Sequence, residues 1–285
     1  MSINIPILDV FSIGNGILLL PFLTTYDANN LRIICKQIHK LVTKFEWNDR
    51  VSPVKGKLSL WKICFPNAIA CNISLNRKVK DSDFHYLHNI YYLDMSYCNQ
   101  ITDKGIAHLS GIHTLNMSHC EQQTITDKGI AHLSGIHTLN MSYCIQQTIT
   151  NQAFKYLKGI HTLHMSNCKQ QTITDEAIAY LSGIHTLNIS ECRQLSDSTF
   201  IHLSGIHTLY MLNCFGITGT GFKYLQGIQE LCMSGCWSIN RTMLASINSN
   251  SNSNSNSNSN FDIKLISHKS FKEIAAIVGI KKFFR

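Results

Sequence analysis

The chain has 285 residues, of which 44% are hydrophobic and 15% are charged, so a buried core is expected and wholesale disorder is excluded. No apolar run approaches the ~20 residues that span a bilayer. No Lys or Arg precedes Arg32, whereas a secretory signal begins with positive charge. We therefore expect a protein of the cytoplasm or nucleus that is neither secreted nor membrane-bound, with its eleven cysteines as free thiols.

The net charge of +8 is unevenly distributed along the chain. Residues 1–66 carry eight Lys and Arg against four Asp and Glu, residues 67–247 carry eleven against eleven, and residues 248–285 carry six against two. A surface that binds nucleic acid needs a basic stripe, and the largest of these segments is neutral. The sequence therefore predicts no nucleic-acid partner.

Residues 1–65 contain no repeat and are predicted to form a small module of short, packed helices. Its apolar residues gather in residues 17–23, 31–35 and 38–42. Trp47 or Trp61 could close this module against the segment that follows.

Residues 66–247 are dominated by an internal repeat. The phrase Gly-Ile-His-Thr-Leu recurs five times, and a cysteine column with steps of 22 or 24 residues runs through Cys98, Cys120, Cys144, Cys168, Cys192, Cys214 and Cys236. One step upstream of Cys98 lies Asn76, so a diverged eighth repeat begins near Pro66. Cys or Asn at this place, with Leu109, Ile112 and Leu115 upstream of Cys120, matches the spacing of leucine-rich repeats.

Each repeat is predicted to hold a short strand followed by a short helix. A Thr or Asp cap opens the helix, two apolar residues three apart line its inner face, and a glycine closes it. One such unit buries little by itself, so neighbours must stack into a continuous core. The fold prediction is an α/β leucine-rich repeat solenoid of about eight repeats of 22–24 residues.

The array resembles the cysteine-containing leucine-rich repeats of F-box/LRR proteins. The residues that carry the resemblance are Cys98, the Ile-Thr-Asp that begins at Ile101, and the Leu-Asn-Met-Ser-His-Cys that ends at Cys120. The near-identical repeats, the Ser-Asn run and the Ile/Asn-rich composition also resemble proteins of large DNA viruses of amoebae, which would place the chain in a host's cytoplasm or nucleus.

The N-terminal module resembles an F-box, which binds the Skp-family adaptor of cullin–RING (SCF) ubiquitin ligases. The matching residues are Phe22-Leu23, the run from Leu31 to Lys36, and Leu41-Val42. The usual Leu-Pro opening is replaced here by Phe11-Ser12. The resemblance implies an apolar adaptor face made of Ile17, Leu20, Leu23 and Leu31. The alternative is a helical cap over the first repeat, which a solenoid needs in any case.

The C-terminal part divides in two. Residues 248–260 alternate Ser and Asn, a composition that cannot bury apolar surface and predicts a linker. In residues 261–285, the run from Gly279 to Phe283 echoes the repeat phrase, which predicts a capping half-repeat.

No pattern in the sequence indicates catalysis or a bound cofactor. Phosphate-binding loops, metalloprotease motifs and nucleophile elbows are absent, and nearly every candidate residue recurs in several repeats, as in a scaffold. Structural zinc takes paired cysteines, whereas Cys232 and Cys236 should point to opposite sides of a strand. The five histidines of the repeat phrase should lie ~4.8 Å apart in neighbouring strands and titrate below free imidazole.

The concave face of the solenoid is the predicted protein-binding surface. In each strand the residues on either side of the buried leucine point to this face, and most of them are small and polar. Tyrosine contributes much of the energy of many interfaces, so we expect contacts where the pattern deviates at the two ends. The predicted partner-binding residues are Tyr92, Asp94, Asn116, Asn140, His164, Asn188, Tyr210, Leu212 and Glu230.

Two functions from different classes follow from these patterns. In the first, the chain resembles the substrate receptor of an SCF ubiquitin ligase, with the adaptor on the N-terminal module and a target protein on the concave face. In the second, it is a protein-binding scaffold with no link to ubiquitin, and the N-terminal module is only a cap.

Overall fold

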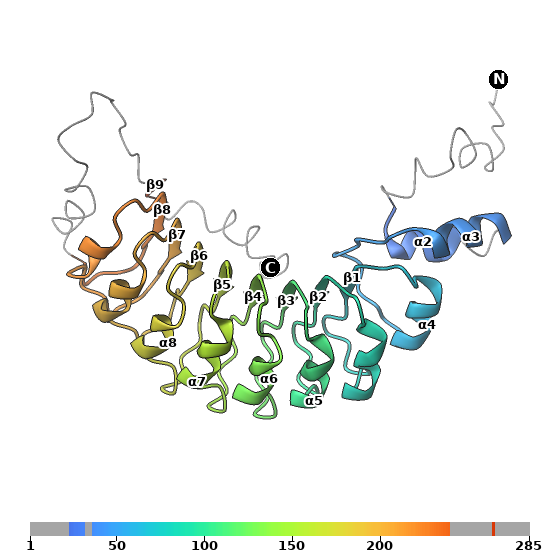
Figure 1. Ribbon diagram of the computed structural model, residues 1–285, viewed down its shortest axis with the longest axis horizontal. Coiled ribbons are helices and arrows are strands. Elements are labelled where there is room, and N and C mark those ends of the chain that lie inside the picture. Colours follow the sequence, from blue (N-terminus) through green and yellow to red (C-terminus); the bar gives the residue numbers. More distant parts are fainter. Residues whose placement is uncertain (1–22, 32–35, 240–263, 266–285) are drawn as a thin grey trace, which may run out of the picture.

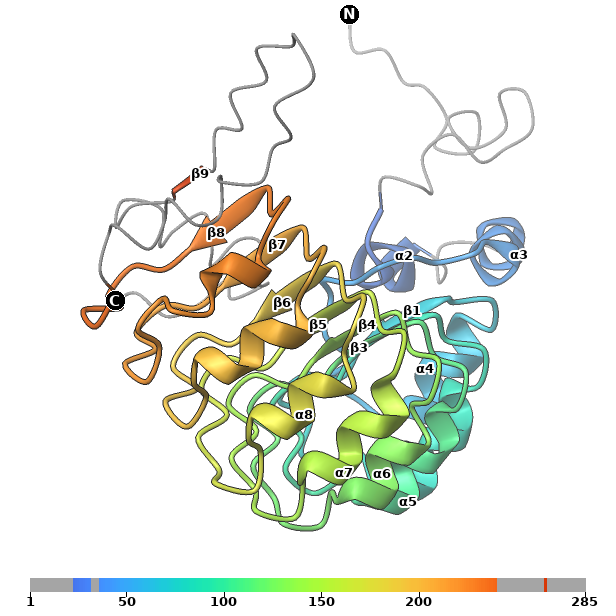
Figure 2. The same cartoon turned by 60° about the vertical axis from the view of Figure 1, so that its left-hand side comes forward.

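The repeats stack into an arc, with strands on its inner side and helices on its outer side (Figure 1). The computed structural model describes residues 23–31, 36–239 and 264–265. Figure 2 shows the helices α5 to α8 lying next to one another on the outer side of the array. The predicted α/β leucine-rich repeat solenoid is confirmed.

A single parallel sheet of nine strands, in chain order, lines the inner side. Each strand has two or three residues and pairs with the next in register, as Leu115 does with Leu139. Residues at the same place in successive repeats therefore form columns. The strands are β1 (Ala70–Asn72), β2 (Tyr92–Asp94), β3 (Thr114–Asn116), β4 (Thr138–Asn140), β5 (Thr162–His164), β6 (Thr186–Asn188), β7 (Thr208–Tyr210), β8 (Glu230–Cys232) and β9 (Lys264–Leu265).

Short α- and 3-10 helices form the outer side of the array, preceded by two helices near the N-terminus. The N-terminal pair is α2 (Thr25–Leu31) and α3 (Lys36–Lys44). The outer helices are α4 (Leu58–Cys64), η2 (Asp81–Leu87), α5 (Asp103–Ile106), η3 (Ala107–Leu109), α6 (Asp127–Ala131), α7 (Asn151–Phe154), η4 (Lys155–Leu157), α8 (Asp175–Ala179), η5 (Asp197–His202) and η6 (Phe222–Tyr224). Among the described residues no helix combines the length and hydrophobicity needed to cross a membrane.

The Thr-Asp pair of the repeat caps the repeat's own helix and also forms hydrogen bonds to the neighbouring repeats. The Thr126 side chain accepts a hydrogen bond from the Lys128 amide at the start of α6. Its hydroxyl and amide donate to the Asp103 carboxylate of the preceding repeat, at 2.7 and 2.8 Å. Thr150 contacts Asp127 in the same way. Each Asp therefore ties its repeat to the next one.

The cysteine column is part of the buried core. The thiol of Cys144 donates to the Met117 carbonyl at 3.2 Å, and the other column cysteines make the equivalent bond to the preceding repeat. Asn76 makes the same connection through its amide, which donates to the Val54 carbonyl. The predicted equivalence of Asn76 with the cysteines is confirmed, because either group satisfies a carbonyl that the turn leaves free.

The hydrogen-bonding pattern of the array continues upstream of residue 66. The Trp47 carbonyl accepts from the amides of Ile69 and Ala70, just as the His113 carbonyl accepts from His137 and Thr138. Pro53 forms a parallel bridge with Asn72, and α4 takes the place of an outer helix. The segment from Trp47 to Cys64 therefore folds as a further, diverged turn of the solenoid.

The two ends of the array are closed differently. Trp47 is 1% exposed and packs edge-on against Phe45 and Phe65, so it covers the core of the first turns. At the other end the chain returns after the Ser-Asn run as β9, where Leu265 lies opposite Leu231 of β8. The predicted echo at Gly279 to Phe283 lies outside the described residues.

Candidate functional site

The concave face is formed by the strand residues that flank the buried leucine column. The Asn and Asp residues at the third strand position share a local role. Their Oδ1 atoms accept the amide hydrogen two residues ahead, at 2.9–3.1 Å, in Asn72, Asp94, Asn116, Asn140 and Asn188. This is an Asx turn, which bends the chain after each strand. In each predicted Asn contact, the Oδ1 atom therefore already accepts a hydrogen bond from a backbone amide of its own repeat.

His164 interrupts the Asn row in the middle of the face. Its Nδ1 atom has no hydrogen-bond partner among the described residues, and its side chain is 9% exposed. Burial lowers the pKa of His164 to about 4, because a desolvated imidazolium is disfavoured. His164 is therefore a neutral imidazole at pH 7.

The N-terminal end of the face combines Tyr92 and Asp94 with a residue that sequence reasoning missed. The Arg50 guanidinium lies over the Tyr92 ring, 4.6 Å from its centroid. Burial and the neighbouring Asp94 raise the pKa of Tyr92, and Arg50 opposes that shift. Arg50 could not be found from the repeat pattern, because it belongs to the diverged turn upstream of residue 66.

The C-terminal end of the face carries a small apolar cluster, separate from the main core, made of Tyr210, Leu212 and Cys232. Leu212 stands where most other repeats have serine, and its amide donates to the Ser190 hydroxyl. Burial and the nearby Glu230 raise the pKa of Tyr210. Strands β3 to β6 separate this cluster from Tyr92 and Asp94, so the two deviating ends form two different sites.

The predicted concave contacts differ in their exposure. Tyr92, Asp94, Asn116 and Glu230 are half-buried. The others, Asn140, His164, Asn188, Tyr210 and Leu212, are buried. The half-buried residues are therefore the more accessible part of the predicted set.

Of the predicted adaptor-binding residues, only Leu23 can be placed fully. It is half-buried and packs against the main core. Ile17, Leu20 and the side chain of Leu31 lie outside the described residues.

The cysteine column has the chemistry of a core rather than of a reactive site. Burial raises the pKa of Cys98 and of Cys192 to about 12, so both are protonated thiols at pH 7. Cys232 lies in the concave cluster while Cys236 donates to the Met211 carbonyl, so the two diverge as predicted. The described part of the chain holds no group of three or more metal-ligating side chains.

The histidine column lies on the flank of the arc where the strands begin. Neighbouring rings stack with centroids 4.4–4.5 Å apart in the order His113, His137, His161, His185 and His207. Tyr91 extends the stack by one ring. Burial and neighbouring imidazoles lower the pKa of both His113 and His185. The predicted proximity of the five rings is confirmed.

Comparison with known proteins shows similarity at the level of fold. No protein-family model and no curated protein matches the sequence. Among solved structures, the chain is similar to the TLR13–ssRNA13 complex (19% identity, TM-score 0.49, 59% of this chain and 26% of that one). It is also similar to the yeast Rad7–Elc1 complex (15%, 0.44, 67% and 62%) and to an internalin of Listeria monocytogenes (18%, 0.44, 67% and 64%). The chain thus spans about a quarter of the first of these proteins and about three fifths of the second.

Proposed function

We propose that the chain is a protein-interaction scaffold that acts as the substrate receptor of an SCF-type ubiquitin ligase. Its N-terminal residues bind a Skp-family adaptor, and its concave face binds the target protein. The observation that carries the scaffold role is the continuous concave sheet, which carries Thr and, apart from His164, Asn in its middle strands and deviates from this pattern at both ends. A surface of this kind can recognise a protein at two separated sites.

The chemistry of the described residues favours binding over catalysis. The thiols of Cys98 and Cys192 are protonated and hydrogen-bonded, and His164 is buried and neutral. The Asp residues of the repeats are engaged in ties between neighbours. None of these groups is a nucleophile next to a free base, which catalysis of group transfer would need.

The ligase link depends on the segment that precedes the array. Trp47 and α4 are parts of the diverged first turn, which packs and hydrogen-bonds against the array. An adaptor-binding face is therefore expected among residues before about residue 46. The F-box resemblance falls in that segment, at residues 17–42. The adaptor is therefore expected to contact Leu20 and Leu31 rather than the tryptophans.

The test is co-purification of the full chain with a Skp-family adaptor. We expect stable capture by the natural chain and loss of capture by a Leu20→Asp/Leu31→Asp variant. A matched control is Val51→Asp/Leu60→Asp, which changes two exposed apolar residues of the array, 66% and 59% exposed. Circular dichroism must first show that all three proteins are folded.

The alternative function is a protein-binding scaffold without a ligase. It would be favoured if the folded natural chain captured no adaptor from any plausible host, and residues 1–46 would then be an N-terminal cap. A loss of capture equal in both variants would show nonspecific apolar adhesion and would also exclude the adaptor site.

A further inference from the structure

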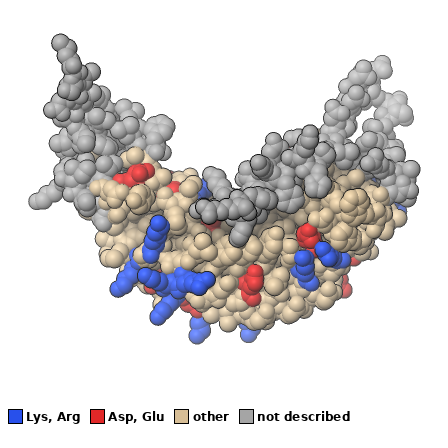
Figure 3. Space-filling model, turned by 180° about the vertical axis from the view of Figure 1, so that it is seen from behind, with Lys and Arg blue, Asp and Glu red and all other residues tan. Residues whose placement is uncertain are grey.

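A basic surface forms on the flank of the arc where the strands end, at its N-terminal end. It comprises five exposed residues from two turns, Lys55, Lys57, Arg77, Lys78 and Lys80. We call them the N-terminal basic patch. Figure 3 views this flank and shows Lys and Arg side chains gathered over one end of the arc.

The two turns are held side by side by hydrogen bonds. The Asn76 amide donates to the carbonyls of Val54 and Gly56 in the upstream turn. From the next repeat, the Gln100 amide donates to the carbonyls of Asn76 and Val79, at 3.0 and 2.9 Å. The patch therefore sits on ordered backbone rather than on free loops.

The charges of the patch are not neutralised within the described residues. None of the five residues forms an ion pair there. The acids that follow them in the chain have other roles, since Asp81 accepts from Thr102 and Asp83 accepts from the Lys80 amide.

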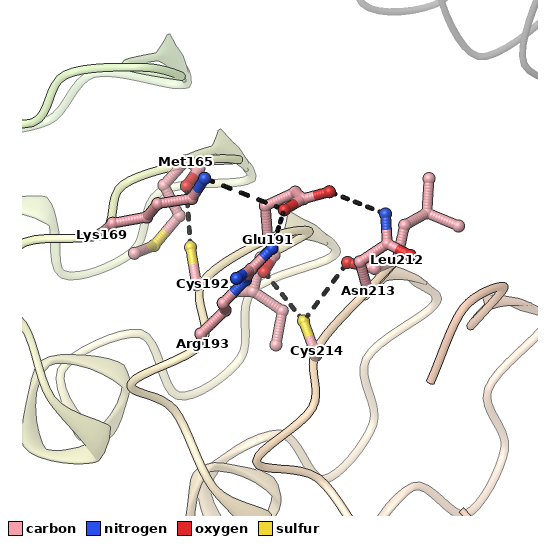
Figure 4. Close-up of polar contacts among 9 residues, drawn as sticks. Met165, Lys169, Glu191, Cys192, Arg193, Leu212, Asn213 and Cys214 are labelled. Atoms are coloured by element: carbon pink, nitrogen blue, oxygen red, sulfur yellow. Dashed lines mark hydrogen bonds and ion pairs between the residues drawn. The ribbon is translucent and has the colours of Figure 1, made fainter. Parts of the chain in front are cut away.

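The other end of the same flank is organised differently (Figure 4). There Glu191 lies 3.9 Å from Lys169 and 3.5 Å from Arg193, and it also accepts a hydrogen bond from Asn213 at 2.7 Å. A single carboxylate of the protein pairs with both positive charges at that end. Among the described residues no carboxylate forms such a pair with the N-terminal basic patch.

We propose that the N-terminal basic patch binds the phosphate backbone of a nucleic acid without sequence preference. A dense row of phosphates gains affinity from released counterions and needs no pocket, which suits side chains that project from outward turns. A nucleic acid carries a phosphate charge at every nucleotide whatever its sequence, whereas an acidic protein segment carries carboxylates only where its sequence places Asp or Glu. The site is separate from the concave face and is independent of the proposed ligase role.

The sequence predicted no nucleic-acid partner, because residues 67–247 are neutral by themselves. The fold, however, brings basic residues of two sequence segments together. Lys55 and Lys57 belong to the basic N-terminal segment, and Arg77, Lys78 and Lys80 belong to the neutral one. The diverged turn joins them into one surface. Of the eleven acids in residues 67–247, Asp81 and Asp83 follow this surface directly and the other nine come later in the chain.

The test is fluorescence anisotropy of a labelled 20-nucleotide single-stranded RNA with the full chain, between 50 and 200 mM NaCl. With five phosphate contacts, the logarithm of the association constant should fall with the logarithm of salt at a slope of about −3.5. An Arg77→Glu/Lys78→Glu variant should bind about tenfold or more weakly at 50 mM NaCl, with a slope reduced by about 1.4.

The matched control is Lys128→Glu/Lys155→Glu, which gives the same net charge but changes two exposed lysines of the outer helices α6 and η4. Neither variant changes the basic residues 248–285, so any RNA binding by those residues contributes equally to both measurements. The control should bind RNA as the natural chain does. Equal weakening in both variants would show that net charge alone drives binding and would overturn the proposal.

A second comparison distinguishes nucleic acid from an acidic protein. Polyglutamate of matched charge should compete with the RNA only at much higher concentration. Competition at equal concentration, abolished by Arg77→Glu/Lys78→Glu, would assign the patch to an acidic protein segment and refute the nucleic-acid proposal. Absence of RNA binding at 50 mM NaCl would refute it as well.

Discussion

At the scale of single residues, the turn after each strand imposes an unusual backbone conformation. The residue before each column member from Asn76 to Cys214 has a positive φ, from 53° to 64°, in Leu75, Tyr97, His119, Tyr143, Asn167, Glu191 and Asn213, and Gly235 before Cys236 has a φ of 77°. Most side chains pay about 1–2 kcal/mol in this left-handed region, and asparagine pays less. The rings of Tyr97, His119 and Tyr143 stack on one another and offset part of this cost.

Leu75 has the strained backbone without that compensation, since its side chain is 65% exposed. We expect Leu75→Asn to raise the free energy of unfolding by about 1 kcal/mol, because asparagine tolerates the left-handed region. The measurement is the urea midpoint at unchanged slope. Leu60→Asn is the control, because Leu60 is 59% exposed but lies in helix α4, where asparagine should bring no gain. A loss of stability in Leu75→Asn would contradict the argument.

At the scale of the elements, the strand register turns each repeated residue into a column. The same register aligns buried leucines, hydrogen-bonded thiols, Asp-to-Thr ties and stacked imidazoles. Each column supplies either hydrogen bonds for the backbone or packing contacts for the side chains, and in each column the partner comes from the neighbouring repeat. This dependence explains why the repeat phrases vary so little: a change in one repeat also removes a partner from the next.

The imidazole column makes stability depend on pH. His113 and His185 have pKa values below that of free imidazole, so the unfolded chain binds more protons than the folded one near pH 6. Their stabilising contribution is therefore present above the pKa of free imidazole and is lost as the pH falls through it. We expect the thermal midpoint to drop between pH 7.5 and 5.5, and to drop less in a His113→Gln/His185→Gln variant. Titration by NMR provides the direct check, and values at or above free imidazole for both residues would disprove the prediction.

At the scale of the whole molecule, the open ends of the stack determine how it is closed. The core is continuous along the array, so its first turn needs a cover. Trp47 provides it: the ring is buried and its Nε1–H donates to the Val42 carbonyl at 2.8 Å. The prediction that a tryptophan closes the N-terminal side is met by Trp47, which reaches the array through its backbone as well as its ring.

Removing this cover should destabilise the whole array. Trp47→Ala is expected to lower the free energy of unfolding by about 3–5 kcal/mol, as for other buried large side chains. Trp237→Ala is the matched control, because Trp237 is 86% exposed and its loss should change stability by less than about 0.5 kcal/mol. Denaturant unfolding of both variants checks the pair. Similar effects of the two substitutions would show that Trp47 does not close the core.

The repeat, its strand and helix, the buried column and the equivalence of Asn76 with the cysteines could all be predicted from the sequence. These follow from periodic local patterns, which a stack of identical turns copies into space. Which concave residues contact a partner stays a prediction.

The further turn from Trp47 to Cys64 could not be predicted, because it joins the array through backbone carbonyls, which every residue has and which no sequence pattern identifies. The same turn places Arg50 over Tyr92 and brings the backbone on either side of Lys55 into hydrogen-bonding contact with Asn76. Contacts between a diverged turn and a regular one depend on how the backbone folds back, and no repeat period encodes that.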